Sequence, residues 1–179
     1  MVTNKYSKIL SSGGIIIYPT DTVYGIGCDA TNINSISKIN KIKNRESNKP
    51  LICLMDSLEM VKKYVAYVPD ISLDYLLNSY EPTTVVFSKS KNLESYPKNI
   101  AIRIPKNKIC LQLIKNLKKP ITSTSANFTG EKAPKYFKQI NKDLLGLVSC
   151  SINFDNDQQN KSSRIISIDD KSNVKIIRN

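Results

Sequence analysis

Hydroxyl-bearing residues and two glycines follow the first apolar run of the chain, in the stretch YPTDTVYGIG (18–27). Such residues at the carboxyl end of a strand present hydroxyls and backbone N–H groups where open α/β sheets commonly bind ligands. Their chemistry suits a small polar substrate. An ordinary turn is the alternative, with Thr and Asp capping and with Gly25 and Gly27 bending the chain.

In the stretch KIKNRESNKPL (41–51), Lys43, Arg45 and Lys49 lie close together, and the only acid among them is Glu46. Arginine offers a planar bidentate fork and lysine a mobile point charge, a combination that suits a triphosphate. The stretch is therefore a candidate phosphate clamp. In so basic a chain, a solvated basic turn is the alternative interpretation.

The stretch PITSTSANFTGEKAP, from Pro120 to Pro134, has six hydroxyl or amide side chains in the eight residues 122–129. Successive side chains and N–H groups of this kind can form an anion-binding concavity, and Gly130 lets the backbone turn away. A plain serine-rich loop is the alternative. A serine nucleophile is disfavoured, because there is no base to activate it and no G-x-S-x-G elbow.

The chain contains no histidine, which excludes Ser-His-Asp hydrolysis, Cys-His nucleophilic chemistry and histidine-based zinc sites. The four cysteines are widely scattered and are expected to be reduced core residues: Cys28, Cys53, Cys110 and Cys150. Neither a signal-peptide pattern nor an apolar run long enough for a membrane span is present, so a cytoplasmic protein without membrane contact is expected.

Composition predicts one globular domain, because 179 residues with 40% apolar content can supply one core. The formal net charge of +12 favours polyanionic partners such as nucleotides or RNA. The abundance of Ile, Lys and Asn could also reflect the codon bias of an AT-rich genome, so charge alone does not choose a partner.

Short apolar or β-branched runs predict strands at 15–18, 51–55, 84–87, 100–104 and 164–168. Helical spacing predicts helices over 33–42, with Thr31 as a possible cap, over 109–117 and over 71–77. The polar segment 153–163 is expected to be a surface loop that either orders over a ligand or connects flexibly. The predicted fold is one α/β domain with an open, twisted, mixed sheet flanked by helices.

Four stretches occur in one order along nearly the whole chain: YPTDTVYGIGCDATN, KIKNRESNKPL, AIRIP and STSANFTG. Together they resemble the YrdC/TsaC family of threonylcarbamoyl-AMP synthases in its short form, with a single YrdC-like domain over 1–179. The resemblance implies that L-threonine, bicarbonate and ATP, with Mg2+ on the phosphates, give L-threonylcarbamoyladenylate and pyrophosphate. Partner proteins would then use the adenylate for the N6-threonylcarbamoyladenosine modification of tRNA, and transient tRNA contact is compatible with this function.

The resemblance also assigns site residues by motif. The expected threonine-binding residues are Thr22, Asn99, Arg103, Ser123 and Ser163, with Arg103 pairing with the substrate carboxylate. The expected ATP-binding residues are Lys43, Arg45, Lys49, Ser125, Asn127, Ala133 and Arg178. The resemblance implies neither a protein nucleophile nor a metal held by protein ligands alone, because positioning and charge stabilisation would carry the reaction.

Several positions depart from the family pattern. Leu54 stands where many relatives have a histidine, Arg164 replaces a threonine, Ser167 lies near the usual aspartate, and Tyr80 and Glu81 replace a Trp-Pro-Gly lead.

Three other functions are alternatives to the synthase. They are an RNA-binding module of the same fold, an enzyme of the dihydroxybutanone phosphate synthase type, which would need clustered acids and a histidine, and ATP hydrolysis that does not depend on threonine.

Overall fold

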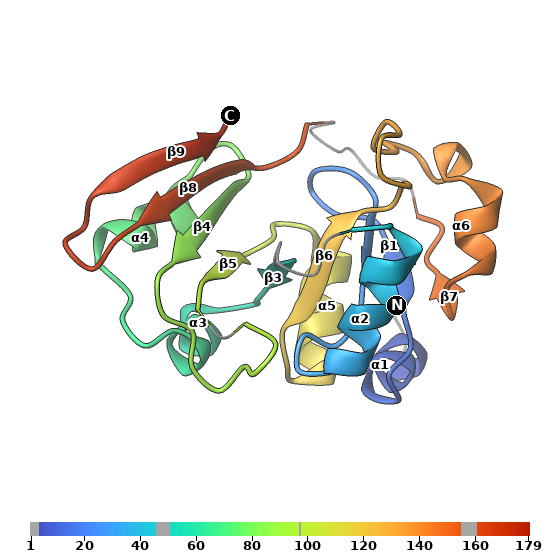
Figure 1. Cartoon of the computed structure of the whole chain (residues 1–179), viewed down its shortest axis with the longest axis horizontal. Helices are drawn as coiled ribbons and strands as arrows, with labels where there is room; N and C mark the ends of the chain where they lie inside the picture. The colour runs from blue at the N-terminus through green and yellow to red at the C-terminus, as the bar shows by residue number, and fades with distance from the viewer. Residues whose placement is uncertain (1–3, 46–50, 97, 155–160) are drawn as a thin grey trace.

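A mixed nine-stranded sheet is the centre of the fold in the computed structural model, which describes residues 4–45, 51–96, 98–154 and 161–179 (Figure 1). In spatial order its strands are β7 (Cys150–Ser151), β1 (Ile16–Tyr18), β2 (Gly25–Gly27), β6 (Ile121–Ser125), β3 (Ile52–Leu54), β5 (Ile100–Arg103), β4 (Thr83–Phe87), β8 (Arg164–Ile168) and β9 (Val174–Arg178). Three neighbouring pairs are parallel and the others antiparallel. The predicted α/β fold with a mixed sheet is confirmed.

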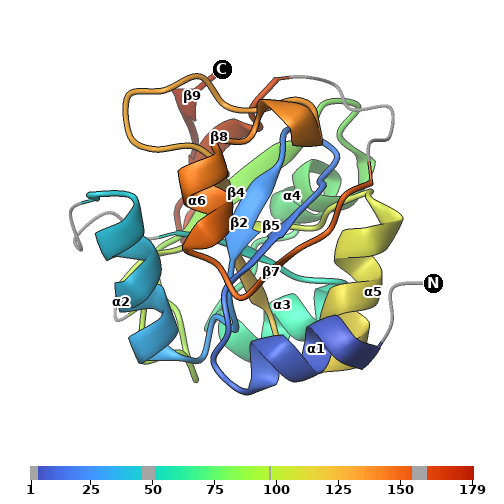
Figure 2. The same ribbon diagram turned by 90° about the vertical axis from the view of Figure 1, so that its right-hand side faces the viewer.

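Helices cover both faces of this sheet. They are α1 (Asn4–Ser11), α2 (Ile33–Ile42), α3 (Leu58–Tyr64), α4 (Ile71–Leu73), which continues as the π-helical turn η1 (Asp74–Asn78), α5 (Lys108–Leu117), the 3-10 turn η2 (Phe137–Gln139) and α6 (Lys142–Gly146). Figure 2 shows α2 and α6 on one side of the strands, with α1 and α5 on the other. The apolar residues are therefore enclosed in layers between helices and sheet.

The strands and helices predicted from periodicity are present, and most of their ends fall within one or two residues of the predicted bounds. One expected cap is wrong. Asn32, not Thr31, caps α2, since its side chain accepts from the backbone N–H of Ser35, whereas the Thr31 hydroxyl donates to Asp29 Oδ1 at 2.6 Å. Thr31 therefore belongs to the turn that precedes α2, and Asn32 is the residue that caps the helix.

Gly25 and Gly27 do not bend the chain, as the turn interpretation would require, but form the ends of strand β2 between β1 and β6. A Cβ atom at Gly27 would collide with the backbone carbonyl of Thr122 and would lie 2.9 Å from the Tyr18 hydroxyl. Glycine is needed at Gly27 for this close approach, and the approach lets the Tyr18 hydroxyl donate to Thr122 O at 2.7 Å.

All four cysteines are free thiols; Cys28, Cys53 and Cys110 are buried and Cys150 is half-buried, which confirms the reduced assignment. Burial raises the pKa of Cys28 and of Cys53 to about 12, so these thiols are protonated and unreactive near neutral pH. No helix among the described residues is both long and apolar enough to cross a membrane. Most of the polar segment 153–163 lies outside the described residues.

Candidate functional site

A cavity of about 460 Å³ lies where the loop after β1 meets strands β5, β6, β8 and β9. It brings together many of the residues that the sequence predicted as a site: Thr22, Arg45, Arg103, Ser123, Ser125, Ser163 and Arg178. Apolar side chains, among them Leu51, Ile52 and Val86, complete the wall. The cavity thus combines three guanidinium groups with a row of hydroxyls, a surface that fits a ligand bearing negative charge.

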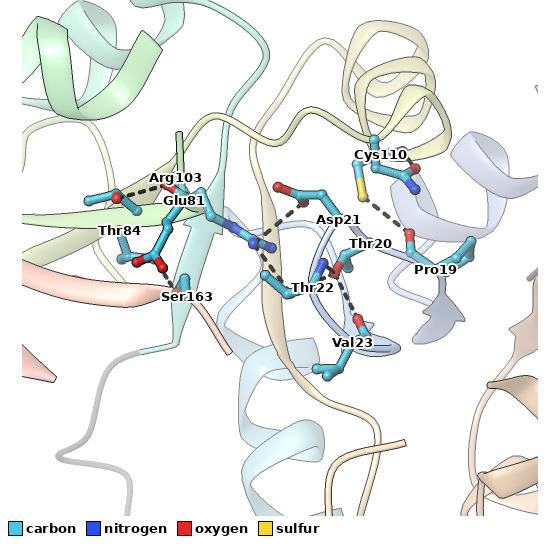
Figure 3. A network of polar contacts seen from close by, with 12 residues as sticks. Pro19, Thr20, Asp21, Thr22, Val23, Glu81, Thr84, Arg103, Cys110 and Ser163 are labelled. Carbon is cyan, nitrogen blue, oxygen red and sulfur yellow. Dashed lines mark hydrogen bonds and ion pairs between the residues drawn. The ribbon is translucent and has the colours of Figure 1, made fainter. Parts of the chain in front are cut away.

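Arg103 ends strand β5 and points toward the loop after β1 (Figure 3). Its Nη1 lies 3.4 Å from Asp21 Oδ1 and donates to Thr22 Oγ1 at 3.3 Å. The exposed fractions of the Arg103 and Asp21 side chains are 5% and 14%, so the pair is largely removed from water. The Nε of Arg103 is buried and has no hydrogen-bond partner, so one donor of the guanidinium group is unused.

Strand β6 supplies the serines of the wall. Ser123 is buried and Ser125 half-buried, and both line the cavity. Gly25 on the neighbouring strand β2 leaves room for Ser123, because a Cβ atom there would lie 3.0 Å from Ser123 Oγ. The first three residues of the STSAN stretch, 123–125, are therefore the end of strand β6, and Ala126 and Asn127 follow in the turn after it.

Lys43 does not line the cavity, contrary to its predicted place in a phosphate clamp. Its Nζ donates to the backbone carbonyls of Ser125 at 2.7 Å and Asn127 at 2.6 Å, and the side chain is buried. Burial, followed by the neighbouring Arg45, lowers the pKa of Lys43 from 10.5 to about 8. The ammonium group thus holds the backbone at the end of strand β6, and Lys43 is not among the residues that line the cavity.

Asn127, also predicted to bind ATP, belongs to the same brace. Its Nδ2 donates to Phe128 O at 3.0 Å and to Glu131 O at 2.6 Å, so the amide closes the turn after β6 instead of facing the cavity. Arg45 lines the cavity as predicted, and burial lowers its pKa. Lys49, the third predicted cation of this cluster, lies outside the described residues.

Ser163 and Arg178 meet at the end of the cavity formed by the β8–β9 hairpin. Ser163 Oγ lies 2.8 Å from Thr84 Oγ1 (Figure 3). Arg178 donates through Nε and Nη2 to Ser163 O at 3.2 and 2.7 Å. Burial and then the positive charge of Arg103 lower the pKa of Arg178. Two arginines that share one cavity in this way favour an anion between them.

Two further predicted residues, besides Lys43 and Asn127, are not part of the cavity wall. Asn99 is exposed just before β5, and four residues of extended strand place it about 13 Å from Arg103. Asn99 and Arg103 therefore do not line one pocket, contrary to the expectation. Ala133 is half-buried in the segment that precedes Pro134, whose carbonyl accepts from the N–H of the cavity residue Tyr24 at 2.9 Å.

The departures from the family pattern also have locations. Leu54 is buried in the core beneath α1 and α5, away from the cavity. The Arg164 guanidinium lies 5.7 Å from the centre of the Tyr75 ring, and Ser167 pairs with Val86 and Lys175 within the sheet. Tyr80 is 90% exposed. None of these four residues lines the cavity described above.

The sequence interpretation missed Asp21 and Thr84, which contact predicted site residues directly. Asp21 lies inside the PTDT stretch, but its ion-pair partner Arg103 is 82 residues away, so no local pattern identifies the pair. In the part of the chain that the structure describes, no three His, Cys, Asp or Glu side chains cluster in a way that could hold a metal ion.

Known proteins are similar to this chain in sequence and in fold. Residues 8–179 match the model of the Sua5/YciO/YrdC family, whose description is "Telomere recombination". A Methanocaldococcus jannaschii protein named "Putative threonylcarbamoyl-AMP synthase" is 36% identical, with 94% of this chain and 81% of the relative covered. A threonylcarbamoyl-AMP synthase of Psychromonas ingrahamii is 34% identical, with 78% and 76% covered.

Among solved structures, Sua5 of Pyrococcus abyssi complexed with L-threonine is 25% identical and superposes with a TM-score of 0.84. The match covers 92% of this chain and 50% of the Sua5 chain, so the present chain spans about half the length of that protein.

Proposed function

The chain belongs to the Sua5/YciO/YrdC family, and we propose on this premise that it is a threonylcarbamoyl-AMP synthase. It would form L-threonylcarbamoyladenylate and pyrophosphate from L-threonine, bicarbonate and ATP. The observation that carries the proposal is the cavity itself, in which Thr22, Arg103, Ser123 and Ser163 face the same space as Arg45 and Arg178. These are the groups that a carboxylate and a polyphosphate require.

The chemistry needs positioning more than covalent help. The threonine amine attacks the carbon of bicarbonate or of the CO2 derived from it, and a carbamate forms, with loss of water when bicarbonate is the source. A carbamate oxygen then attacks the α-phosphorus of ATP, the bond between the α- and β-phosphates breaks, and pyrophosphate leaves. Holding the reactants together removes much of the entropic barrier, with effective molarities of roughly 10⁵ M attainable.

In this proposal Arg103 binds the threonine carboxylate, and Asp21 and Thr22 hold its guanidinium in place. Arg45 and Arg178 offset the charge of the nucleotide phosphates. Lys43 and Asn127 act on the ligand only through the backbone to which they donate, and Thr84 acts through the hydroxyl of Ser163. The roles of Asn99, Lys49 and Ala133 rest on the family resemblance alone.

Mg2+ belongs to the proposal as a companion of ATP. The cavity wall offers guanidinium groups and hydroxyls, which fit phosphate oxygens, and not the set of carboxylates that a protein cage for Mg2+ would need. When bound, the ion would neutralise charge on the phosphates. The residues of this chain would orient those phosphates, with Arg45 and Arg178 as their direct partners.

The product is an activated carbamoyl donor, so a further protein must transfer its threonylcarbamoyl group to tRNA. We include these partner proteins, and transient tRNA contact through the +12 net charge, in the proposal. A cytoplasmic location is part of the same proposal, because ATP and tRNA are available there.

The test is to incubate the purified chain with labelled bicarbonate, ATP and Mg2+, with and without L-threonine. Threonine-dependent pyrophosphate and an acid-labile labelled adenylate are expected. ATP turnover that does not depend on threonine would instead indicate ATP hydrolysis. Binding of RNA without any turnover would indicate the RNA-binding module, and either outcome would remove the synthase assignment.

A further inference from the structure

Behind the cavity residue Thr22 lies a second threonine, Thr20, which is 1% exposed and does not form part of the cavity wall. Thr20 Oγ1 makes three polar contacts: 2.7 Å to Val23 O, 3.0 Å to the N–H of Thr22, and 2.8 Å to Thr22 Oγ1 (Figure 3). A hydroxyl has one proton and two lone pairs, so these contacts use its whole hydrogen-bonding capacity.

The directions of these bonds follow from the partners. A carbonyl oxygen can only accept, so the single proton of Thr20 goes to Val23 O. The backbone N–H of Thr22 can only donate, so it uses one lone pair of Thr20 Oγ1. The remaining contact is then a bond in which Thr22 gives its hydroxyl proton to Thr20.

On its other side, Thr22 Oγ1 accepts from Arg103 Nη1 at 3.3 Å. A guanidinium group cannot accept a hydrogen bond, so the direction of the bond from Arg103 to Thr22 is fixed as well. The order is therefore fixed from Arg103 through Thr22 and Thr20 to Val23 O. Thr22 has no proton left for the cavity and one lone pair that remains available to a ligand.

The remaining lone pair of Thr22 Oγ1 can accept one hydrogen bond from a ligand. Thr22 Oγ1 already accepts from Arg103 Nη1, whose charge is paired with Asp21, so a neutral hydroxyl of the ligand can donate to this lone pair. We propose that Thr20 is a positioning residue that makes Thr22 a pure acceptor, so that the cavity selects a ligand whose own hydroxyl donates there. This inference rests on the proposed function, in which the ligand hydroxyl is that of L-threonine.

The experiment compares the dissociation constants of L-threonine and O-methyl-L-threonine, measured by titration calorimetry on the whole chain. The methyl ether keeps the oxygen but has lost the donor. For the Thr20→Val variant, which preserves shape but releases the Thr22 proton, the preference for L-threonine over the ether should fall about tenfold, the ordinary worth of one hydrogen bond. Steric exclusion of the methyl group would act equally in both proteins and would leave the ratio unchanged.

Two control variants separate this role from general loosening. Thr20→Ser keeps the hydroxyl and should keep the wild-type ratio. Thr83→Val removes a buried hydroxyl that also donates to a nearby carbonyl, Glu81 O at 3.0 Å, but from a residue that does not contact Thr22, and it should keep the ratio too. If Thr20→Val does not fold, Thr20→Ala asks the same question with a smaller side chain.

The outcomes are distinct. A ratio that is lower in Thr20→Val and retained in Thr20→Ser and Thr83→Val supports the inference. Equal ratios in the wild type and Thr20→Val, or an equal fall in Thr83→Val, would overturn it while leaving the synthase proposal intact. Failure of the wild-type chain to bind L-threonine at all would overturn the proposed function, and this inference with it.

Discussion

Arg103 and Asp21 form an ion pair at the wall of the cavity, with Nη1 and Oδ1 3.4 Å apart and both side chains largely buried. The pair joins the end of strand β5 to the loop after β1. A buried guanidinium group needs a counter-charge, and in the absence of ligand Asp21 supplies it. A ligand carboxylate would therefore enter a site whose cation is already positioned.

Asp21→Asn should lower the free energy of unfolding by about 2 to 4 kcal/mol, because it leaves the buried Arg103 charge without its partner. The same variant should show a larger rise in melting temperature with saturating L-threonine than the wild type, since the ligand carboxylate then supplies the missing charge. Chemical denaturation and thermal melting measure the two effects. A ligand-induced shift smaller than that of the wild type would contradict this role of Asp21.

Arg103→Ala should raise the KM for L-threonine about 10- to 100-fold, the effect expected from losing one charge-assisted carboxylate contact. The KM for ATP should change much less. Arg164→Ala is the matched control, because that guanidinium group stacks on Tyr75 outside the cavity and its removal should leave both constants nearly unchanged. Equal losses for threonine and ATP in Arg103→Ala would reject the carboxylate assignment.

Lys43 should make stability depend on pH in the alkaline range. Its pKa is about 8 in the folded protein and near 10.5 when unfolded, so the unfolded chain binds more protons between these values. The free energy of unfolding of the wild type relative to Lys43→Met should therefore rise by about 1 to 3 kcal/mol from pH 8 to 10.5. Urea titrations of both proteins at several pH values test this, and a difference that is constant with pH would refute the lowered pKa.

Gly27→Ala should destabilise the protein by about 2 kcal/mol or more, because its Cβ would meet the backbone carbonyl of Thr122, which cannot move aside without disturbing strand β6. Gly146→Ala is the matched control. No atom lies within 4 Å of a Cβ placed there, and in α6 alanine should stabilise by about 0.5 to 1 kcal/mol. Similar unfolding free energies for the two variants would show that β2 does not require glycine.

Much of the fold was predictable because its signals are local. The isoleucine spacing of α2 and the β-branched run of β4 identify a helix and a strand without knowledge of their neighbours. Strand β2 was not predictable in this way, since Gly-Ile-Gly is typical of a turn and becomes a strand only between β1 and β6. Edge strand β9 was missed, and its residues are exposed on both faces, so no alternation of apolar and polar residues marks it.

Several predicted site residues line the cavity, among them Thr22, Arg103 and Ser163, and their binding roles stay predictions. Other predicted residues do not line it, because a distant backbone group uses the side chain. Lys43 and Arg45 are two residues apart and both cationic, yet one braces Ser125 O and the other lines the cavity. Periodicity and composition carry no information on that choice.

The amino-acid sequence by itself therefore determines the alternation of helix and strand, the absence of histidine chemistry and the family to which the chain belongs. Only the tertiary structure decides which hydroxyl faces the ligand and whether that hydroxyl donates or accepts a hydrogen bond. The direction of the bond from Thr22 to Thr20 follows from the local contacts of Thr20, but the bond from Arg103 to Thr22 joins residues 81 positions apart. Such contacts arise only when the packed sheet brings β5 to the loop after β1, because hydrogen bonds act over ångströms in space and not along the chain.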